Sequence, residues 1–127
     1  MFKKIFSLGL ATFVLLACNT CFAEMTDSDY HGGIAKLHSQ IKDAYHDYVH
    51  AKANIRKMAL EQIDKLGRSP KDAKTRKTIL RDCEKKEADL KEAYKAKKNS
   101  LLNKEKALWS EYKESRQKTE IKKSAEE

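Results

Sequence analysis

Two acid–histidine pairs in the first half of the chain are the residues whose types and spacing could do chemistry. The set is Asp43, His46, Asp47 and His50. A spacing of i, i+3, i+4 and i+7 places all four side chains on one face of a helix. Imidazole and carboxylate groups bind zinc and similar divalent ions, and imidazole changes its charge near pH ~6.5. The set predicts a metal-binding or acid-sensing module, although such pairs also occur on ordinary solvated helix faces.

A second candidate site is a group of nine Lys and Arg residues around a turn predicted at residues 67–70, which we call the basic tip. Its members are Arg56, Lys57, Lys65, Arg68, Lys71, Lys74, Arg76, Lys77 and Arg81. Only Glu61, Asp64 and Asp72 offset their charge. Such a group attracts an acidic protein or an anionic envelope surface by salt-sensitive forces, or it simply keeps a helical rod soluble. Nucleic acid is a poor candidate, because no aromatic residues are interleaved for base stacking.

The sequence carries no motif for catalysis. It has no Gly-rich phosphate loop, no Gly-x-Ser-x-Gly pattern, and no cysteine and histidine spaced to cooperate. We therefore expect a protein that is not an enzyme and that has no cofactor, apart from the zinc considered above. Cys83 is the one cysteine after residue 23. It acts either as a small buried apolar residue or as a thiol that pairs with another molecule in an oxidising compartment.

An apolar repeat predicts the long helix that carries the acid–histidine set. Apolar residues recur at alternating steps of three and four, at Ile34, Leu37, Ile41, Ala44, Tyr48, Ala51, Ile55 and Met58. This heptad pattern is typical of a coiled-coil seam. After Met58, the apolar residues Ala59, Ile63 and Leu66 come one position late. We therefore expect the supercoil to relax locally at this point.

A turn signal separates this helix from a second one. Gly67 suits the left-handed conformation that often ends a helix. Ser69 is a favoured N-cap residue, and Pro70 is favoured in the first helical turn. Asp72 adds a negative charge where a helix N-terminus favours it. A turn this short makes the two helices antiparallel neighbours.

The second helix is expected to run from residue 70 to about residue 118, with a poorer apolar stripe. Folding the chain about Arg68 places Ile55 beside Leu80 and Ile34 beside Leu102. The predicted seam, which is also the candidate surface for a protein partner or for self-association, consists of Ile34, Leu37, Ile41, Tyr48, Ile55, Met58, Leu80, Leu90, Tyr94, Leu101 and Leu108. A hairpin of two helices buries little apolar surface, so a partner or a second copy is expected to stabilise it.

The aromatic residues of this hairpin gather away from the basic tip once the two helices are folded together. They are Tyr30, Tyr45, Tyr48, Tyr94, Trp109 and Tyr112. Aromatic side chains with polar groups suit binding interfaces, and they also serve as ordinary seam residues.

Residues 1–23 have the pattern of an export signal. Lys3 and Lys4 precede thirteen uncharged, mostly apolar residues at 5–17, a run shorter than the ~20 residues of a membrane-spanning helix. Cleavage after Ala23 gives a soluble periplasmic or secreted protein with no transmembrane span. Cleavage before Cys18 gives a lipoprotein instead. We expect the soluble product, because Leu16 is bulky for a lipidation motif.

The predicted fold is all-α, with two long helices in an antiparallel coiled-coil-like hairpin preceded by a cleaved signal peptide. The signal occupies residues 1–23, a flexible segment 24–33, the hairpin 34–118 and a charged, frayed tail 119–127. Because Gly32 and Gly33 weaken a helix, the first helix either starts at Ser28 and frays or starts near Ile34. Residues 24–66 carry six Lys and Arg against seven Asp and Glu, whereas residues 67–127 carry nineteen against twelve. These features predict an exported, basic scaffold that binds another macromolecule, by holdase-like capture or by self-association.

Overall fold

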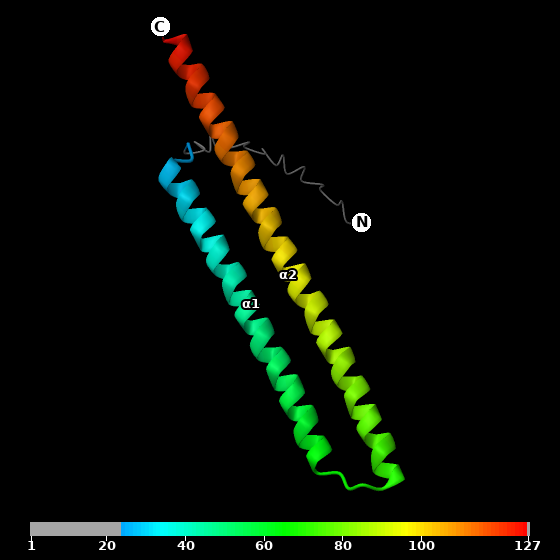
Figure 1. Ribbon diagram of the computed structural model, residues 1–127. Coiled ribbons are helices and arrows are strands. Elements are labelled where there is room, and N and C mark those ends of the chain that lie inside the picture. Colours follow the sequence, from blue (N-terminus) through cyan, green and yellow to red (C-terminus); the bar gives the residue numbers. More distant parts are fainter. Residues whose placement is uncertain (1–23, 127) are drawn as a thin grey trace, which may run out of the picture.

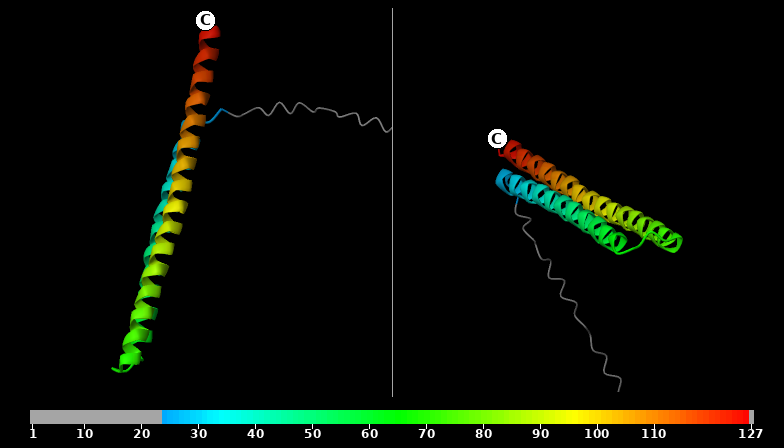
Figure 2. Two further views of the ribbon diagram at one scale, coloured as in Figure 1. Left: turned by 90° about the vertical axis from the view of Figure 1, so that its right-hand side faces the viewer. Right: turned by 60° about the horizontal axis from the view of Figure 1, so that its bottom comes forward.

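Two long helices account for most of the chain that the computed structural model describes, residues 24–126. Helix α1 spans Asp27–Asp64 and helix α2 spans Pro70–Ala125. They lie side by side and run in opposite directions (Figures 1 and 2). No strand occurs within residues 24–126, so the predicted all-α helical hairpin is confirmed. The predicted signal peptide, including Cys18, lies outside the described residues.

Neither α1 nor α2 combines the length with the apolar character that a membrane-spanning helix requires.

Helix α1 begins seven residues before Ile34, and a capping box explains the early start. The Thr26 side-chain oxygen accepts a hydrogen bond from the Asp29 backbone N–H at 3.1 Å, and the Asp29 carboxylate accepts one from the Thr26 backbone N–H at 3.2 Å. These reciprocal bonds satisfy two backbone donors at the helix start. The helix therefore runs through Gly32 and Gly33, instead of beginning after a flexible segment at 24–33.

Helix α2 begins as its sequence predicts. Ser69 is the N-cap, and its hydroxyl oxygen accepts a hydrogen bond from the Asp72 backbone N–H at 3.1 Å. Pro70 is the first helical residue, where its missing N–H costs no helical hydrogen bond. The helix continues to Ala125, past the predicted end near residue 118.

The end of α1 differs from the prediction. The helix stops at Asp64, and the Leu66 backbone N–H donates to the Ile63 carbonyl oxygen at 3.0 Å, which tightens the last turn. No glycine within the described residues has a positive φ, so the prediction of a left-handed Gly67 is wrong. The Gly67 carbonyl instead accepts a hydrogen bond from the Arg76 guanidinium, and this contact ties the turn to α2.

The register of the two helices also differs from the prediction. Asp47 pairs with Lys97 at 3.9 Å, and the ring of Tyr48 stacks on that of Tyr94 with centroids 5.0 Å apart. Opposite residues therefore have numbers that add to 142–144. Folding about Arg68 predicted a value near 136, so α2 is displaced by about seven residues, or nearly two helical turns.

This displacement leaves the first two turns of α2 without α1 beside them. Figure 1 shows α2 reaching further than α1 at the end with the turn. At the opposite end α2 also extends past the start of α1, towards the C-terminus. The hairpin is thus an offset rod in which α2 is exposed at both ends.

The seam between the helices buries few side chains completely. Within residues 24–126 the buried residues are Ala44, Ala59 and Leu101. Most of the predicted seam is half-buried, namely Ile34, Leu37, Ile41, Tyr48, Ile55, Leu90, Tyr94 and Leu108. Gly33 permits a close approach near the start of α1, because a Cβ atom there would lie 2.7 Å from a Leu108 methyl carbon. The core is therefore one thin layer of side chains.

Two predicted seam residues lie outside this layer. Met58 is 61% exposed and Leu80 is 50% exposed. On α1 the seam steps four residues from Ile55 to the buried Ala59, so the interruption of the heptad repeat begins one step earlier than predicted. On α2 the half-buried Ile79 occupies the seam, which turns the neighbouring Leu80 outward.

Candidate functional site

The acid–histidine set lies on the exposed surface of α1, and its side chains are not gathered around one point. All four of its side chains are exposed. Asp47 is directed towards α2, where its carboxylate lies 3.9 Å from the Lys97 ammonium. In the part of the chain that the structure describes, no three His, Cys, Asp or Glu side chains are arranged to hold a metal ion. Helical spacing places these residues on one face but does not direct their ligand atoms to one point.

Three members of the basic tip are engaged in contacts within the hairpin. The Arg56 guanidinium binds the Glu87 carboxylate across the two helices, with Nη2 to Oε2 at 3.0 Å and a second bond from Nε. Lys57 lies 4.0 Å from Glu61 on the same helix. Arg76 donates to a carbonyl of the turn. These three side chains therefore contact other parts of the hairpin and are less available to a partner.

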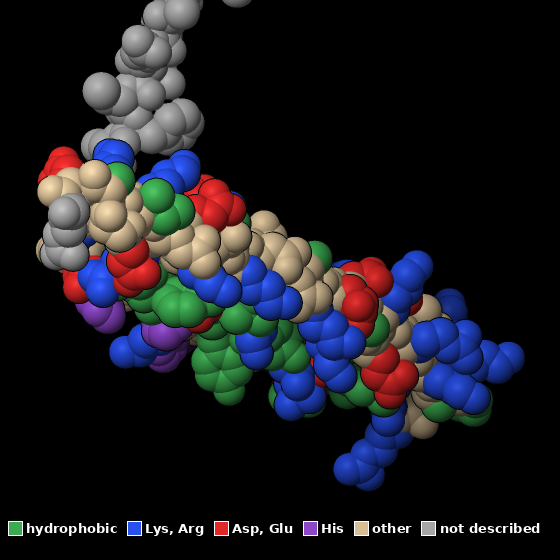
Figure 3. Space-filling model, turned by 90° about the horizontal axis from the view of Figure 1, so that it is seen from above, with side chains coloured by type: hydrophobic (Ala, Val, Ile, Leu, Met, Phe, Trp, Pro, Cys, Tyr) green, Lys and Arg blue, Asp and Glu red, His purple; other side chains and the backbone are tan. Residues whose placement is uncertain are grey.

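The other six members of the basic tip are exposed and form no ion pair with any described residue. We call them the free tip residues; they are Lys65, Arg68, Lys71, Lys74, Lys77 and Arg81. They lie in the turn, just before it, and on the first turns of α2. Figure 3 shows Lys and Arg side chains gathered at this end of the rod. The first turns of α2, which extend past the end of α1, therefore expose the positive charges of their free tip residues to solvent on several sides.

Glu87 is the acidic residue that holds the two helices together near the tip. Its side chain is only 19% exposed, and Lys52 approaches it at 3.9 Å in addition to Arg56. The hydrogen bond from Arg56 lowers the pKa of Glu87, and the Glu87 carboxylate in turn raises the pKa of Arg56. Glu87 interrupts the apolar stripe of α2, and at this position its carboxylate pairs with two cations of α1, Arg56 and Lys52.

Two layers of aromatic rings cross the hairpin away from the tip, as predicted. In the layer nearer the middle, Tyr48 stacks on Tyr94, and Tyr45 lies 6.1 Å from Tyr94 between ring centroids. Half of the Tyr45 surface, 51%, remains exposed. The middle layer is therefore both part of the seam and part of the outer surface.

The second aromatic layer lies near the start of α1. Tyr30 stacks on Tyr112 with centroids 4.4 Å apart, and Trp109 lies 5.6 Å from Tyr30. Trp109 is 52% exposed. The Tyr112 hydroxyl donates to the Asp27 carboxylate at 2.7 Å, and this bond raises the pKa of Tyr112.

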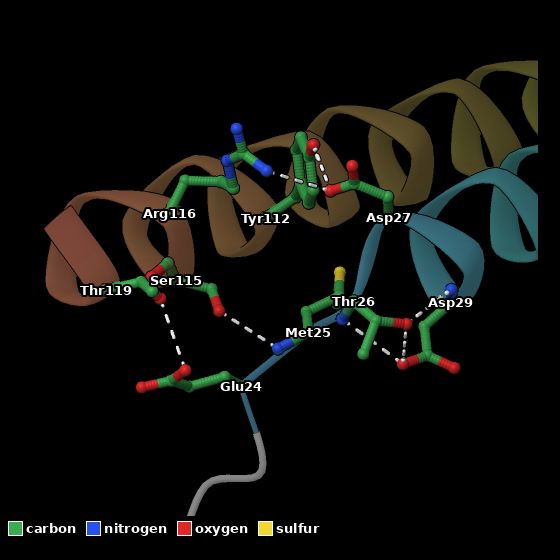
Figure 4. A network of polar contacts seen from close by, with 9 residues as sticks. All are labelled: Glu24, Met25, Thr26, Asp27, Asp29, Tyr112, Ser115, Arg116 and Thr119. Carbon is green, nitrogen blue, oxygen red and sulfur yellow. Dashed lines mark hydrogen bonds and ion pairs between the residues drawn. The ribbon is translucent and has the colours of Figure 1, made fainter.

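A polar network fastens the first described residues to α2 (Figure 4). The Met25 backbone N–H donates to the Ser115 hydroxyl oxygen at 2.9 Å. Asp27 accepts hydrogen bonds from Tyr112 and, at 3.2 Å, from Arg116. These contacts join residues about ninety positions apart, so no local sequence pattern predicts them.

Glu24 extends this network by one further turn of α2. Its carboxylate accepts hydrogen bonds from Lys122 at 2.7 Å and from the Thr119 hydroxyl at 3.2 Å. The bond from Lys122 is the main cause of the lowered pKa of Glu24. The predicted frayed tail thus contains residues that hold the start of the described chain.

Cys83 is a free thiol within the described residues and is half-buried. It lines a shallow hollow between the helices together with Ile55, Met58 and Ala59. This position matches the interpretation of Cys83 as a small apolar residue of the seam.

Comparison of the chain with protein-family models, with curated proteins and with solved structures finds no match.

Proposed function

We propose that this protein is an exported scaffold, not an enzyme, that binds an acidic macromolecule through its basic tip. The observation that carries the proposal is the group of six free tip residues, which are exposed and unpaired within the described chain. Elsewhere on the rod several charged side chains are paired across the helices, as Arg56 is with Glu87. An unpaired cluster of one sign retains its attraction for a partner of opposite charge.

The shape of the turn end supports this role. Residues 65–81 contain seven Lys and Arg against Asp72 alone, a net charge of +6. The Asp72 carboxylate accepts a hydrogen bond from the Ser69 hydroxyl and lies at the start of α2. Because α2 projects past α1, the cluster forms the outermost part of the rod (Figure 1). A partner can therefore approach it without contacting the rest of the hairpin.

The binding test compares two triple variants of the purified protein that change the net charge equally. Lys71, Lys74 and Lys77 are replaced by Glu in the tip variant, and Lys104, Lys106 and Lys113 in the control; all six are exposed on α2. The probe is fluorescent polyglutamate at about 50 mM salt. We expect the tip variant to bind at least tenfold more weakly than the control. Equal weakening would mean that net charge, and not the tip, drives binding, and the proposal would fail.

A second experiment tests export. The protein is recovered from its native cell with its partners, and its intact mass is measured. We expect a chain that begins at Glu24 and co-purifies with acidic proteins. A lipid-modified Cys18 would establish the lipoprotein instead, and an uncleaved chain in the cytosol would contradict export.

A further inference from the structure

Exposed apolar side chains lie along one flank of the rod. Ion pairs identify the flank, because Arg56 of α1 meets Glu87 of α2, and His38 meets Glu105 at 3.6 Å. Residues four or seven positions away from these four lie close to the same side of their helix. The large apolar residues among them, which we call the apolar flank, are Tyr45, Val49, Leu60, Leu80 and Trp109, and they are 42–58% exposed.

The opposite side of the rod is different. It carries the Asp47–Lys97 pair and one large exposed apolar residue, Met58, among the described residues that face this way. Apolar exposure is therefore concentrated on one side, and Figure 3 shows hydrophobic side chains exposed between Lys and Arg side chains.

Four of the five residues of the apolar flank, all but Leu60, are nearly symmetric about a common midpoint. On α1, Tyr45 and Val49 are centred on residue 47; on α2, Leu80 and Trp109 are centred between residues 94 and 95. The Asp47–Lys97 pair shows that these two midpoints lie at the same level of the rod. Leu80 and Trp109 each lie about 22 Å from this level at ~1.5 Å per residue. A two-fold axis through the midpoint would exchange Tyr45 with Val49 and Leu80 with Trp109.

We propose that a second copy of this chain covers the apolar flank in an antiparallel arrangement about that two-fold axis. A self-complementary patch is the requirement for such a symmetric dimer. In this arrangement, α1 lies against the partner subunit's α1, and α2 against the partner subunit's α2. Tyr45 then meets the partner's Val49, and Trp109 meets the partner's Leu80. The result is a four-helix bundle in which all neighbouring helices are antiparallel.

The charges of the two ends favour the antiparallel arrangement over a parallel one. Along the flank, the exposed Lys91 comes to the level of the partner's Lys98, so their ammonium groups have to point to solvent. The turn end, residues 65–81, carries +6, whereas residues 24–33 and 110–120 at the other end carry three Lys and Arg against six Asp and Glu, or −3. An antiparallel dimer places each positive end beside a negative one, and a parallel dimer places two +6 ends together. The ion pair of Arg56 with Glu87 is already formed within each copy, so covering it leaves neither charge unpaired.

The available area is sufficient for a stable dimer. From the level of Trp109 to that of Leu80 the flank is about 44 Å long, and two helices side by side are about 20 Å wide. The product, roughly 900 Å² per copy, is similar to the ~800 Å² per partner of an ordinary stable interface. The dimer goes beyond the proposed binding of an acidic partner and gives it two tips about 60 Å apart, at opposite ends of the bundle.

Sedimentation equilibrium of the purified protein tests the dimer. We expect a dimer whose dissociation constant rises at least tenfold in Val49→Lys and stays within about threefold in Met58→Lys, an exposed apolar residue on the opposite side. Circular dichroism verifies that both variants keep their helices. A strictly monomeric protein overturns the inference, even if it captures unfolded proteins or binds polyglutamate. Equal effects of the two substitutions overturn it as well.

Disulfide crosslinking tests the direction of the two copies. In a Cys83→Ala background, Trp109→Cys and Leu80→Cys proteins are oxidised separately and as a mixture. We expect a crosslinked dimer in the mixture and little in either protein alone, because the antiparallel arrangement brings position 109 to the partner's position 80. The mixed dimer keeps one unmodified Trp109–Leu80 contact. Crosslinking of each protein with itself would demonstrate a parallel dimer and overturn the inference.

Discussion

The two ends of the hairpin differ in how the helices are held together. At the open end, which holds the start of α1, the helices are joined by the Tyr30–Tyr112 stack, by the bond from Met25 to Ser115 and by the network around Asp27. At the turn end, the first two turns of α2 extend past α1 and carry three of the free tip residues, Lys71, Lys74 and Lys77.

The difference has a physical reason. At the turn end a covalent connection of a few residues already keeps the helices close, so little further loop entropy has to be overcome. At the open end only side chains do this, and a helix start without such contacts frays. The turn end can therefore leave its charged side chains free for a partner, while the open end uses its polar and aromatic side chains for the fold.

The largest expected effect is the difference in stability lost when a buried leucine and an exposed leucine, on the two halves of α2, are replaced by alanine. Leu101, towards the open end, is 7% exposed, and Leu80, towards the turn, is 50% exposed. We expect Leu101→Ala to lower the free energy of unfolding by about 2–4 kcal/mol, because it leaves a cavity in a thin core. Leu80→Ala should cost less than about 1 kcal/mol within a single copy of the chain. Urea unfolding at a protein concentration below the dissociation constant of the proposed dimer measures both losses, and equal losses would contradict the difference in burial.

The two N-caps provide a sharper comparison of the ends. Removing an N-cap hydroxyl costs typically about 1 kcal/mol. We expect this full effect for Thr26→Ala, because the start of α1 supports the contacts of the open end. Ser69→Ala should have a smaller effect on global unfolding, because the turns that it caps do not contact α1.

Hydrogen exchange distinguishes the two N-cap substitutions by location. Thr26→Ala should speed exchange of the first amides of both α1 and the part of α2 opposite, whereas Ser69→Ala should affect only the start of α2. Spreading of the Ser69→Ala effect into α1 would show that the turn end is as tightly coupled as the open end.

Alanine substitutions at two adjacent glycines of the open end should change the stability of the protein by different amounts. A Cβ atom at Gly32 meets nothing within 4 Å, whereas one at Gly33 lies 2.7 Å from Leu108. We expect Gly32→Ala to raise the free energy of unfolding by up to about 1 kcal/mol, the difference in helix propensity. Gly33→Ala should give less, because the Leu108 side chain has to move. Thermal unfolding measures both, and an equal gain would contradict the close approach of the helices.

The smallest expected effect is a loss of stability in acid. Hydrogen bonds from Lys122, Thr26 and Arg56 lower the pKa values of Glu24, Asp29 and Glu87, respectively. A carboxyl group with a lowered pKa stabilises the folded state when the pH is above its ordinary pKa, about 3.9 for Asp and about 4.3 for Glu. This stability is lost as the pH falls through the lowered pKa.

Thermal unfolding between pH 7 and pH 2.5 measures this loss. The double variant Glu24→Gln and Asp29→Asn removes the acidic groups of the open end, and Glu87→Gln removes the one nearer the turn. We expect the melting temperature of each variant to depend less on pH than that of the parent protein. A parent protein that is more stable at pH 3 than at pH 6 would have the opposite sign from that expected.

The parts of the fold that were predictable from sequence depend on neighbouring residues. The N-cap at Ser69, the start of α2 at Pro70 and the interruption of the repeat near Ala59 all follow from local patterns. The capping box at Thr26 and Asp29 was also readable as a Thr-x-x-Asp pattern. Gly32 and Gly33, which weaken a helix, instead favoured a later start. The pairing of Arg56 with Glu87 was not readable, because it depends on what the side chain meets across the hairpin.

The sequence by itself determined that this chain forms two helices joined by a short turn, because apolar periodicity, capping residues and proline act over a few neighbouring positions. Only the tertiary structure decided the register, and with it the overhang of α2. Register depends on the sum of many contacts between distant residues, such as Gly33 with Leu108 and Tyr48 with Tyr94. Each contact contributes little, and its two residues lie too far apart in the chain for local sequence to predict it.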